Sequence, residues 1–465
     1  MQVKSLGVVI LLFAILLVTS WINPSFLSES NVESIIRWTS LFGFISLGIA
    51  LVIMTGGIDL SIGSVIALSG VIMLLLLDQK HIDMESSTKV VSISKVEWKG
   101  QELPKVLLDN KDLQVRTDDQ FRFVDRRGQN TQGSVVTVEK TGDGLNVIFR
   151  EPSLQVTAGT ELRWFRFSHR PIWLVLILVL LASAFIGAFH GWLITKVRLQ
   201  PFVVTMCGLL AYRGIARVLS GEQSKGLGST LVDVKDWFKG TAFSFPVPGL
   251  PFVSDGRWHS VVWDSKTNTP LLNSSGEQQS VAWYSMVEMP TTGILLLIVG
   301  LAIWFLVNRT VFGRYLLALG NNAQAAKFSG ISTDRIVMIT YIMCSMLAGL
   351  TGILLSFDFN TIEPSQTGMV YEMYAVAAAV IGGCSLRGGS GSIVGVIIGT
   401  AVMRSLFLAI GALDIAKSWE FIVIGIALLA AVLTDELIRI ASDARRLRAQ
   451  VKLAAAANAV LAASK

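Results

Sequence analysis

Side chains with reactive chemistry are few in this chain of 465 residues, and none belongs to a catalytic pattern. The sequence has only four His and three Cys residues. They are not grouped at the spacing of a metal site, and no nucleophile is paired with a base. Cys207, Cys344 and Cys384 lie in apolar segments and are interpreted as small buried side chains without a disulfide. We therefore expect no catalysis, no metal and no cofactor.

One short stretch suggests nucleotide chemistry: VLSGEQSKG, from Val218 to Gly226. It resembles the signature loop with which ATP-binding-cassette (ABC) ATPases clamp a nucleotide in a partner subunit. Nucleotide phosphates also need a loop of the form G-x-x-x-x-G-K-[ST], and the sequence contains none. The match is therefore interpreted as coincidental. If ATP hydrolysis drives this protein, another polypeptide must perform it.

The remaining candidates are polar residues inside apolar segments. Arg404 lies near the middle of IVGVIIGTAVMRSLFLAIG, where a charge costs at least ~2.5 kcal/mol and needs a cavity or a partner. Two roles stay open for Arg404: a buried ion pair, with Glu372 as the first candidate partner, or the lining of a translocation path. His190 lies between Gly187 and Gly191, a spacing that favours close helix contact. A helix-packing hydrogen bond is favoured for His190 over a solute contact.

Membrane helices must position these residues, because 52% of the chain is hydrophobic and only 15% is charged. A bilayer core needs roughly 20 apolar residues per helical span. The pattern predicts an all-α polytopic membrane protein with about ten transmembrane segments. The expected spans are residues 6–22, 35–55, 60–77, 172–195, 202–219, 290–307, 336–357, 373–384, 393–411 and 420–434.

The distribution of Lys and Arg predicts that both termini are cytoplasmic, since basic residues concentrate in cytoplasmic loops. The short loops 23–34 and 358–372, which this topology places outside, contain no Lys or Arg. The basic residues that it places inside are Lys4, Lys196, Arg198, Arg309, Arg314, Lys327, Arg335, Arg387, Arg439, Arg445, Arg446 and Arg448. The net charge of +6 is therefore explained by the cytoplasmic loops and is no evidence for a nucleic-acid partner, and none is expected.

Two polar segments interrupt the membrane pattern, and the topology places both outside. The first, about 79–170, alternates apolar and polar residues, which predicts an inserted small β-rich periplasmic domain of six or seven strands. The second, 221–289, is rich in Pro, Ser and Asn and is expected to be irregular, with room for one hairpin. The predicted organisation is transmembrane segments 1–3 in residues 1–78, the β-rich domain in 79–170, segments 4–5 in 171–220, a periplasmic loop in 221–289, segments 6–10 in 290–440 and a cytoplasmic tail in 441–465.

A glycine-rich break stands between the second and third spans, in MTGGIDLSIGSVIALSG. Gly56 and Gly57 permit backbone conformations closed to other residues. Asp59 is placed to accept the free amides of a helix that begins at Leu60. An ordinary helix cap is the favoured role of Asp59.

The cytoplasmic loop 312–333 contains a short predicted helix, Ala323–Phe328, between Gly320 and Gly330. Ala325 and Ala326 are expected to present a face of small residues that a partner's groove can accept. From these features alone, partner docking and a plain connection between helices are equally supported.

Three motifs, GGIDLSIGS, GNNAQAAKFSGI and IGGCSLRGGSGSIVG, resemble in order and spacing the permease subunit of ribose, xylose and galactoside type ABC importers. The similarity covers essentially all the membrane segments. It identifies the helix break with the family motif residues Gly56, Gly57, Asp59, Ser61 and Gly63. It also implies a coupling loop that contacts the ATPase subunit, made of Gly320, Asn321, Asn322, Ala325, Ala326, Ser329, Gly330 and Ile331.

The resemblance implies import of a simple sugar by alternating access across a bacterial inner membrane. The implied partners are a second permease subunit, alike or different, two cytoplasmic ATPase domains and a periplasmic sugar-binding protein. The chain departs from the family pattern in its long segments 79–170 and 254–286 and at His190 and Arg404. Two alternatives stay open: import of another small polar solute, such as a nucleoside or a sugar-derived signal, and a membrane receptor whose outer domain senses a ligand.

Overall fold

The computed structural model divides the chain into two compact units, Met1–Leu74 with Leu176–Lys465, here called the helical unit, and Leu75–Val175, the barrel unit. The structure describes residues 3–78, 81–98, 101–109, 115, 120–124, 130–141, 144–150, 161–168, 170–227, 232–248, 284–416, 419, 421–423, 425–427, 429, 430, 432, 433 and 436. The predicted cytoplasmic tail, 441–465, lies outside the described residues.

Helices account for most of the described part of the helical unit, because runs of about 20 apolar residues satisfy their backbone hydrogen bonds internally. The helices are α1 (Val3–Ile22), the 3-10 helix η1 (Pro24–Leu27), α2 (Glu29–Met54), α3 (Ile62–Asp78), α4 (Ile172–Thr195), α5 (Pro201–Ser220), α6 (Val232–Lys239), α7 (Thr291–Arg309), α8 (Val311–Asn321), α9 (Ala323–Phe328), α10 (Thr333–Phe359), α11 (Tyr371–Ile381) and α12 (Ile393–Ala412).

Within the described residues, six helices are long and apolar enough to cross a membrane: α2, α4, α5, α7, α10 and α12. Three shorter apolar helices, Gly7–Ile22, Ile62–Leu77 and Tyr371–Ile381, coincide with other predicted spans. The last predicted span, 420–434, is described only in part. The structure is therefore that of a mostly helical, polytopic membrane protein, as the composition predicted.

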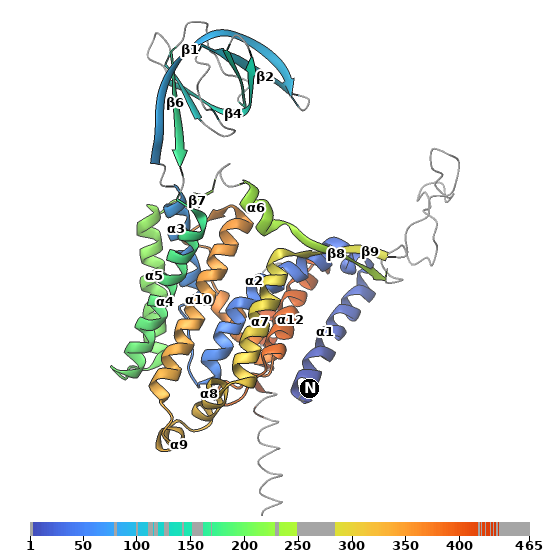
Figure 1. Cartoon of the computed structure of the whole chain (residues 1–465). Helices are drawn as coiled ribbons and strands as arrows, with labels where there is room; N and C mark the ends of the chain where they lie inside the picture. Colours follow the sequence, from blue (N-terminus) through green and yellow to red (C-terminus); the bar gives the residue numbers. More distant parts are fainter. Residues whose placement is uncertain are drawn as a thin grey trace, which may run out of the picture. The chain divides into compact units, whose positions relative to one another are not determined.

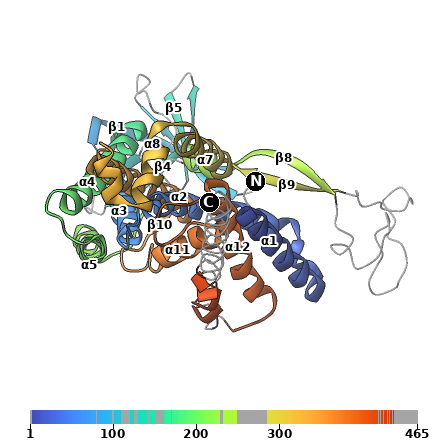
Figure 2. The ribbon, with the colours of Figure 1, turned by 90° about the horizontal axis from the view of Figure 1, so that it is seen from below.

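Helix α2 is the centre of the helical unit. It packs against α7, α10, α11 and α12, and its side chains from Leu41 to Met54 are almost completely buried. Figures 1 and 2 show α4 and α5 together on one side of the bundle and α1 on the opposite side, where α1 packs against α12. Cys207 of α5 is exposed, so its interpretation as a buried side chain is wrong, whereas Cys344 and Cys384 are buried.

The barrel unit is built from six strands, β1 (His81–Trp98), β2 (Gln101–Leu108), β3 (Gln120–Val124), β4 (Asn130–Thr141), β5 (Gly144–Phe149) and β6 (Glu161–Ser168). They form a closed barrel in the order β1-β2-β5-β4-β3-β6. The long strand β1 closes it by pairing with β2 along one half and with β6 along the other.

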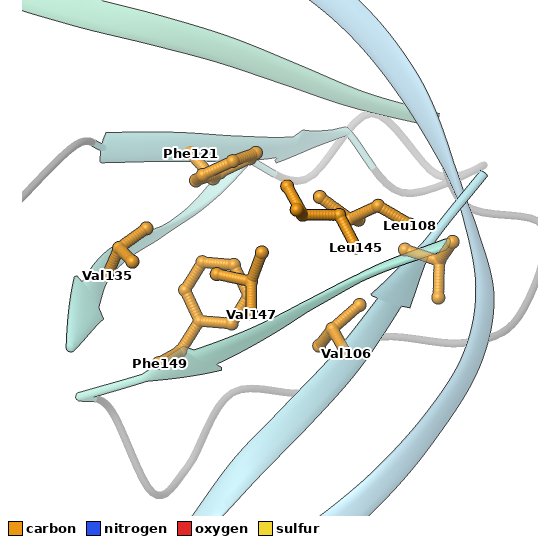
Figure 3. Packing of buried hydrophobic residues seen from close by; sticks show 8 residues of the cluster. Val106, Leu108, Phe121, Val135, Leu145, Val147 and Phe149 are labelled. Atoms are coloured by element: carbon orange, nitrogen blue, oxygen red, sulfur yellow. The ribbon is translucent and has the colours of Figure 1, made fainter. Parts of the chain in front are cut away.

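Alternating apolar residues fill the barrel (Figure 3). Along β5, Leu145, Val147 and Phe149 point inward, since successive side chains of a strand face opposite sides. The ring of Phe149 meets that of Phe121 edge to face, with centroids 5.3 Å apart. The core is completed by Val90, Val106, Leu108 and Val135.

The segment 221–289, which the sequence analysis predicted to be an outer loop, contains several short elements. Strand β8 (Thr241–Pro248) pairs with β9 (Tyr284–Pro290), and β7 (Lys225–Gly226) pairs with β10 (Thr361–Ile362). Helix α6 was not predicted, because eight residues carry too weak a periodic signal. Its Phe238 stacks on Phe357 of α10, with ring centroids 4.4 Å apart, so contact with α10 stabilises α6. Residues 249–283 lie outside the described part.

Candidate functional site

The backbone between α2 and α3 leaves the helical path from Thr55 to Ser61. Gly56 adopts a φ of 84°, which favours glycine. Asp59 is fully buried, and its Oδ1 accepts hydrogen bonds from the amide of Ser61 (2.9 Å) and from its hydroxyl (2.7 Å). Helix α3 begins at Ile62, because the carbonyl of Ser61 is the first to accept helical amides. The predicted start at Leu60 is wrong, and Asp59 fixes the residue before the helix rather than its first turn.

Helices α5 and α10 hold this break in place. The carbonyl of Ile58 accepts hydrogen bonds from Tyr341 Oη (3.2 Å) and Thr205 Oγ1 (3.4 Å). The Oδ2 atom of Asp59 is buried. Four polar residues on three helices interact electrostatically with Asp59, namely His190, Tyr212, Tyr341 and Cys344. The break is therefore the centre of a buried polar cluster.

His190 connects α4 to α5. Its side chain is 1% exposed, and its Nε2 lies 2.9 Å from the hydroxyl oxygen of Tyr212. The two glycines that flank it face α10 instead, where a methyl group at Gly187 would collide with the backbone of Tyr341 and one at Gly191 would lie 2.8 Å from Cα of Met338. The structure thus provides the helix-packing hydrogen bond that the sequence favoured.

Arg404 of α12 stacks on aromatic rings. The guanidinium carbon lies 4.6 Å from the ring centre of Trp38, 5.1 Å from that of Phe42 and 4.7 Å from that of Phe407. Such cation–π contacts stabilise a positive charge away from water. Arg404, Phe42 and Tyr374 line a cavity of about 10 Å³, the space of one water molecule. The sequence offered no signal for Trp38 and Phe42, because α2 and α12 are far apart in the chain, whereas Phe407 lies three residues after Arg404 on α12 and was overlooked.

Glu372, the predicted partner of Arg404, lies at the start of α11 beside Gly63 of α3. A methyl group at Gly63 would lie 2.5 Å from Oε2 of Glu372 and would collide with the backbone carbonyl of Gly368, so no larger residue fits there. The basic residue that interacts electrostatically with Glu372 is Arg213 of α5, which donates hydrogen bonds to the carbonyls of Pro364 (3.1 Å) and Thr367. Glu372 therefore has a different basic neighbour from the one predicted.

The predicted coupling loop is formed by α8, α9 and the turn that follows. The structure confirms the helix Ala323–Phe328. The side chain of Asn322 caps it by accepting the amide of Ala325 (2.9 Å), and the hydroxyl of Ser329 donates to the carbonyl of Ala325 (2.9 Å). At the other end, the amide of Ile331 donates to the carbonyl of Ala326. These bonds make α9 an ordered helix despite its length.

The expectation that Ala325 and Ala326 share one exposed face is wrong. Ala325 is exposed, whereas Ala326 is 5% exposed and buried, because consecutive residues of a helix point in different directions. Phe328, which the sequence analysis overlooked, is 89% exposed. The exposed face of α9 therefore combines a small residue with a large apolar one.

The LSGEQ stretch forms an ordinary helix end. Gly221 ends α5 in the left-handed conformation, and the amide of Glu222 donates to the carbonyl of Arg217 (2.8 Å). The side chains of Arg217 and Glu222 form an exposed ion pair. Local backbone geometry thus accounts for these residues. Among the described residues, no group of three His, Cys, Asp or Glu side chains could hold a metal ion.

Comparison with known protein families identifies the family of this chain. Residues 31–432 match the family described as branched-chain amino acid transport system, permease component. The chain belongs to this family. As a permease component it is not an enzyme, and ATP hydrolysis in such a transport system is performed by a separate subunit, as predicted.

Individual relatives of this permease match it over nearly its whole length. The ribose import permease protein of Escherichia coli K12 is 26% identical over 437 residues, covering 94% of both chains. The xylose transport system permease protein of the same strain is 25% identical, covering 91% of this chain and 89% of the relative. The ribose import permease protein of Bacillus subtilis is 24% identical, covering 93% and 92%. No solved structure matches the permease.

Proposed function

We propose that this permease moves a simple sugar of the ribose or xylose kind inward by alternating access, driven by a separate ABC ATPase. The observation that carries the proposal is the end-to-end similarity to permeases named for ribose and xylose, which covers about nine-tenths of each chain. Specificity in such systems resides largely in the binding protein, so the pentose class is proposed rather than one sugar.

The proposed site of action is the bacterial inner membrane, crossed about ten times, with both termini in the cytoplasm. The absence of Lys and Arg from loops 23–34 and 358–372 supports this orientation. It assigns the barrel unit and the segment 221–289 to the periplasm. There the barrel is proposed to assist docking of the binding protein.

Three partners are proposed: a cytoplasmic ATPase, a periplasmic sugar-binding protein and a second permease subunit. The loop 312–333 is proposed to dock on the ATPase. The exposed side chains of Ala325 and Phe328 support this role, because an exposed apolar residue on an ordered helix suits the groove of a partner.

A second candidate is import of another small polar solute, such as a nucleoside or a sugar-derived signal. Arg404 and its aromatic neighbours favour it, since stacked rings and a planar donor group suit a flat, polar molecule. In this alternative Arg404 lines the path, and the small cavity widens when the helices α2, α11 and α12 separate.

Uptake into proteoliposomes tests both candidates. The permease is reconstituted with its ATPase and binding protein, and radiolabelled ribose, xylose and adenosine are supplied with and without internal ATP. ATP-dependent accumulation of a pentose supports the first proposal. Accumulation of adenosine alone supports the second, and transport of neither class under conditions where the binding protein is liganded contradicts both.

A further inference from the structure

The three motifs of this permease, far apart in the sequence, meet at one point of the helical unit. The amide of Gly389 donates a hydrogen bond to the carbonyl of Met54, the last residue of α2 (2.9 Å). The side chain of Asn321, the last residue of α8, donates to the carbonyl of Gly389 (3.1 Å). We call this meeting point the glycine junction; it consists of Met54, Gly56, Gly320, Asn321, Gly388 and Gly389.

Backbone packs directly on backbone at the junction. A methyl group at Gly320 would collide with the carbonyl of Met54 and the amide of Gly389. One at Gly388 would lie 2.8 Å from the amide nitrogen of Gly56 and 2.9 Å from the carbonyl oxygen of Gly320. Gly389 has a φ of 75° and touches the side chain of Asn321. Most of these close contacts are between main-chain atoms, which cannot rotate away as side chains do, so the three segments are packed tightly against one another.

On one side, the junction is joined to the exposed helix of the coupling loop. Asn321 ends α8, and the next residue, Asn322, caps α9 with its side chain and accepts the amide of Ala326 with its carbonyl. The amide of Asn322 in turn donates to the carbonyl of Ala318 in α8. Hydrogen bonds of Asn322 thus connect α9 to the end of α8, directly beside Asn321.

On the other side, the junction is joined to the break between α2 and α3. Met54 is followed at once by the non-helical residues Thr55–Ser61, which include the buried carboxylate of Asp59. The carbonyl of Ile58 within this break accepts hydrogen bonds from α5 and α10. The break that follows Met54 is thus connected to three further helices, α3, α5 and α10.

We propose that the glycine junction transmits displacement of α9 to the α2–α3 break, with Asn321 as the positioning residue. The inference rests on the proposed function in one respect, that α9 docks on the ATPase. The hydrogen bond from Asn321 to Gly389 keeps the two segments in register, and the close approach at Gly320 makes the contact stiff enough to transfer motion.

The test uses the assembled complex of permease, ATPase and binding protein. Uptake per ATP hydrolysed is measured together with hydrogen exchange of the peptide containing Met54–Ser61, with and without a non-hydrolysable ATP analogue. In the wild type, nucleotide is expected to change the exchange of this peptide. In Asn321→Leu the change is lost, and uptake per ATP falls about fivefold, the factor that corresponds to one hydrogen bond of about 1 kcal/mol.

Two further variants separate transmission from folding. Asn321→Asp nearly keeps the shape of the side chain, but it replaces the donor with a negatively charged oxygen that faces the carbonyl of Gly389, so it should impair uptake per ATP at least as much as Asn321→Leu. Gly320→Ala should reduce uptake per ATP by more than ~10-fold, because overpacking against backbone leaves no relaxed alternative. If Gly320→Ala fails to fold, the uptake per ATP and the hydrogen exchange of Asn321→Asp test the proposal instead.

The matched controls lie elsewhere on the helical unit. Asn308 of α7 donates to the carbonyl of Trp304 in its own helix (2.9 Å), as Asn321 does to the carbonyl of Leu317 (2.8 Å), and Gly214 of α5 has open space around it. Asn308→Leu and Gly214→Ala should transport as the wild type does. Wild-type coupling and exchange in both Asn321 variants would overturn the inference. An ATPase that fails to bind the wild-type permease, or that binds Ala325→Glu normally, would instead reject the proposed docking.

Discussion

The barrel unit and the glycine junction are held together by opposite means. The barrel is filled by large alternating side chains, such as Phe121 and Phe149, whose burial stabilises it. At the junction the side chains are missing, and the carbonyl of Met54 meets the glycines Gly320 and Gly389 directly. The packing of the barrel depends on large apolar side chains, whereas the packing of the glycine junction depends on residues that have no side chain.

This difference determines how each region can change. A barrel core tolerates exchanges among apolar residues of similar size, because its requirement is volume and pattern. A backbone contact tolerates no added carbon at Gly320, since the colliding atoms belong to the main chain and cannot rotate away. The region built from side chains is adaptable, and the region built from backbone is suited to transmit movement.

The largest expected effect is on the barrel. Phe149 is fully buried, and Phe149→Ala should destabilise the barrel unit by about 3–5 kcal/mol through lost burial and a cavity. Faster hydrogen exchange in strands β2, β4 and β5, with unchanged exchange in α2 and α10, is the expected measurement. The conservative variant Phe149→Leu should lose less. Equal loosening of α2 would contradict the division into two units.

Arg404 provides an intermediate case, a charge packed among side chains within the helical unit. Its contacts with three rings should stabilise the protein by about 2 kcal/mol, so Arg404→Leu should lower the melting temperature and Arg404→Lys should recover part of the loss. Thermal melting of the purified permease is the measurement. A stable Arg404→Leu variant with reduced uptake would favour the translocation path instead.

A smaller effect is expected at Asn322, the residue that follows the glycine junction and caps α9. Asn322→Ala removes the cap of α9, which should cost about 1 kcal/mol of helix stability and weaken ATPase binding about fivefold. Binding of the ATPase to immobilised permease measures this. Asn308→Ala, which removes an exposed amide without a cap, is the control. Unchanged affinity would show that the order of α9 does not matter for docking.

Local patterns in the sequence sufficed for part of this architecture. Apolar length predicted the membrane helices, and the glycines Gly320 and Gly330 marked α9 at the bounds that the structure has. The start of α3 was misplaced because Asp59 bonds to Ser61, outside the helix. Asp and Ser are both common helix-capping residues, so the sequence could not show whether Asp59 or Ser61 stands directly before the helix.

Contacts between distant segments had no local signal at all. Nothing near Arg404 in the chain indicates Trp38, and nothing near Asn321 indicates Gly389, because such pairs arise only when α2 packs on α12 and α8 packs on the turn between α11 and α12. The glycines of the three motifs could be recognised as unusual. The contact between these glycines could not be predicted, because a glycine in a sequence does not indicate which other segment packs against it.

The smallest effect on the helical unit is expected from removing the barrel altogether. His81 at the start of β1 pairs with Ser168 at the end of β6, so the chain enters and leaves the barrel at neighbouring positions. A short Gly/Ser linker in place of residues 82–168 should therefore close the gap without strain. The helical unit should keep its melting temperature within ~2 °C and still bind the ATPase, because its spans satisfy their own backbone groups.

Uptake that depends on the binding protein should nevertheless fall in this deletion variant, since the barrel is proposed to assist docking. Phe149→Ala, which keeps the full chain length but loosens the barrel, is the matched control and should lose less uptake. Undiminished uptake after the deletion would leave the barrel without a role in transport. Unfolding of the helical unit would show that its stability depends on the barrel, and the contrast between an adaptable region and a transmitting one would then no longer hold.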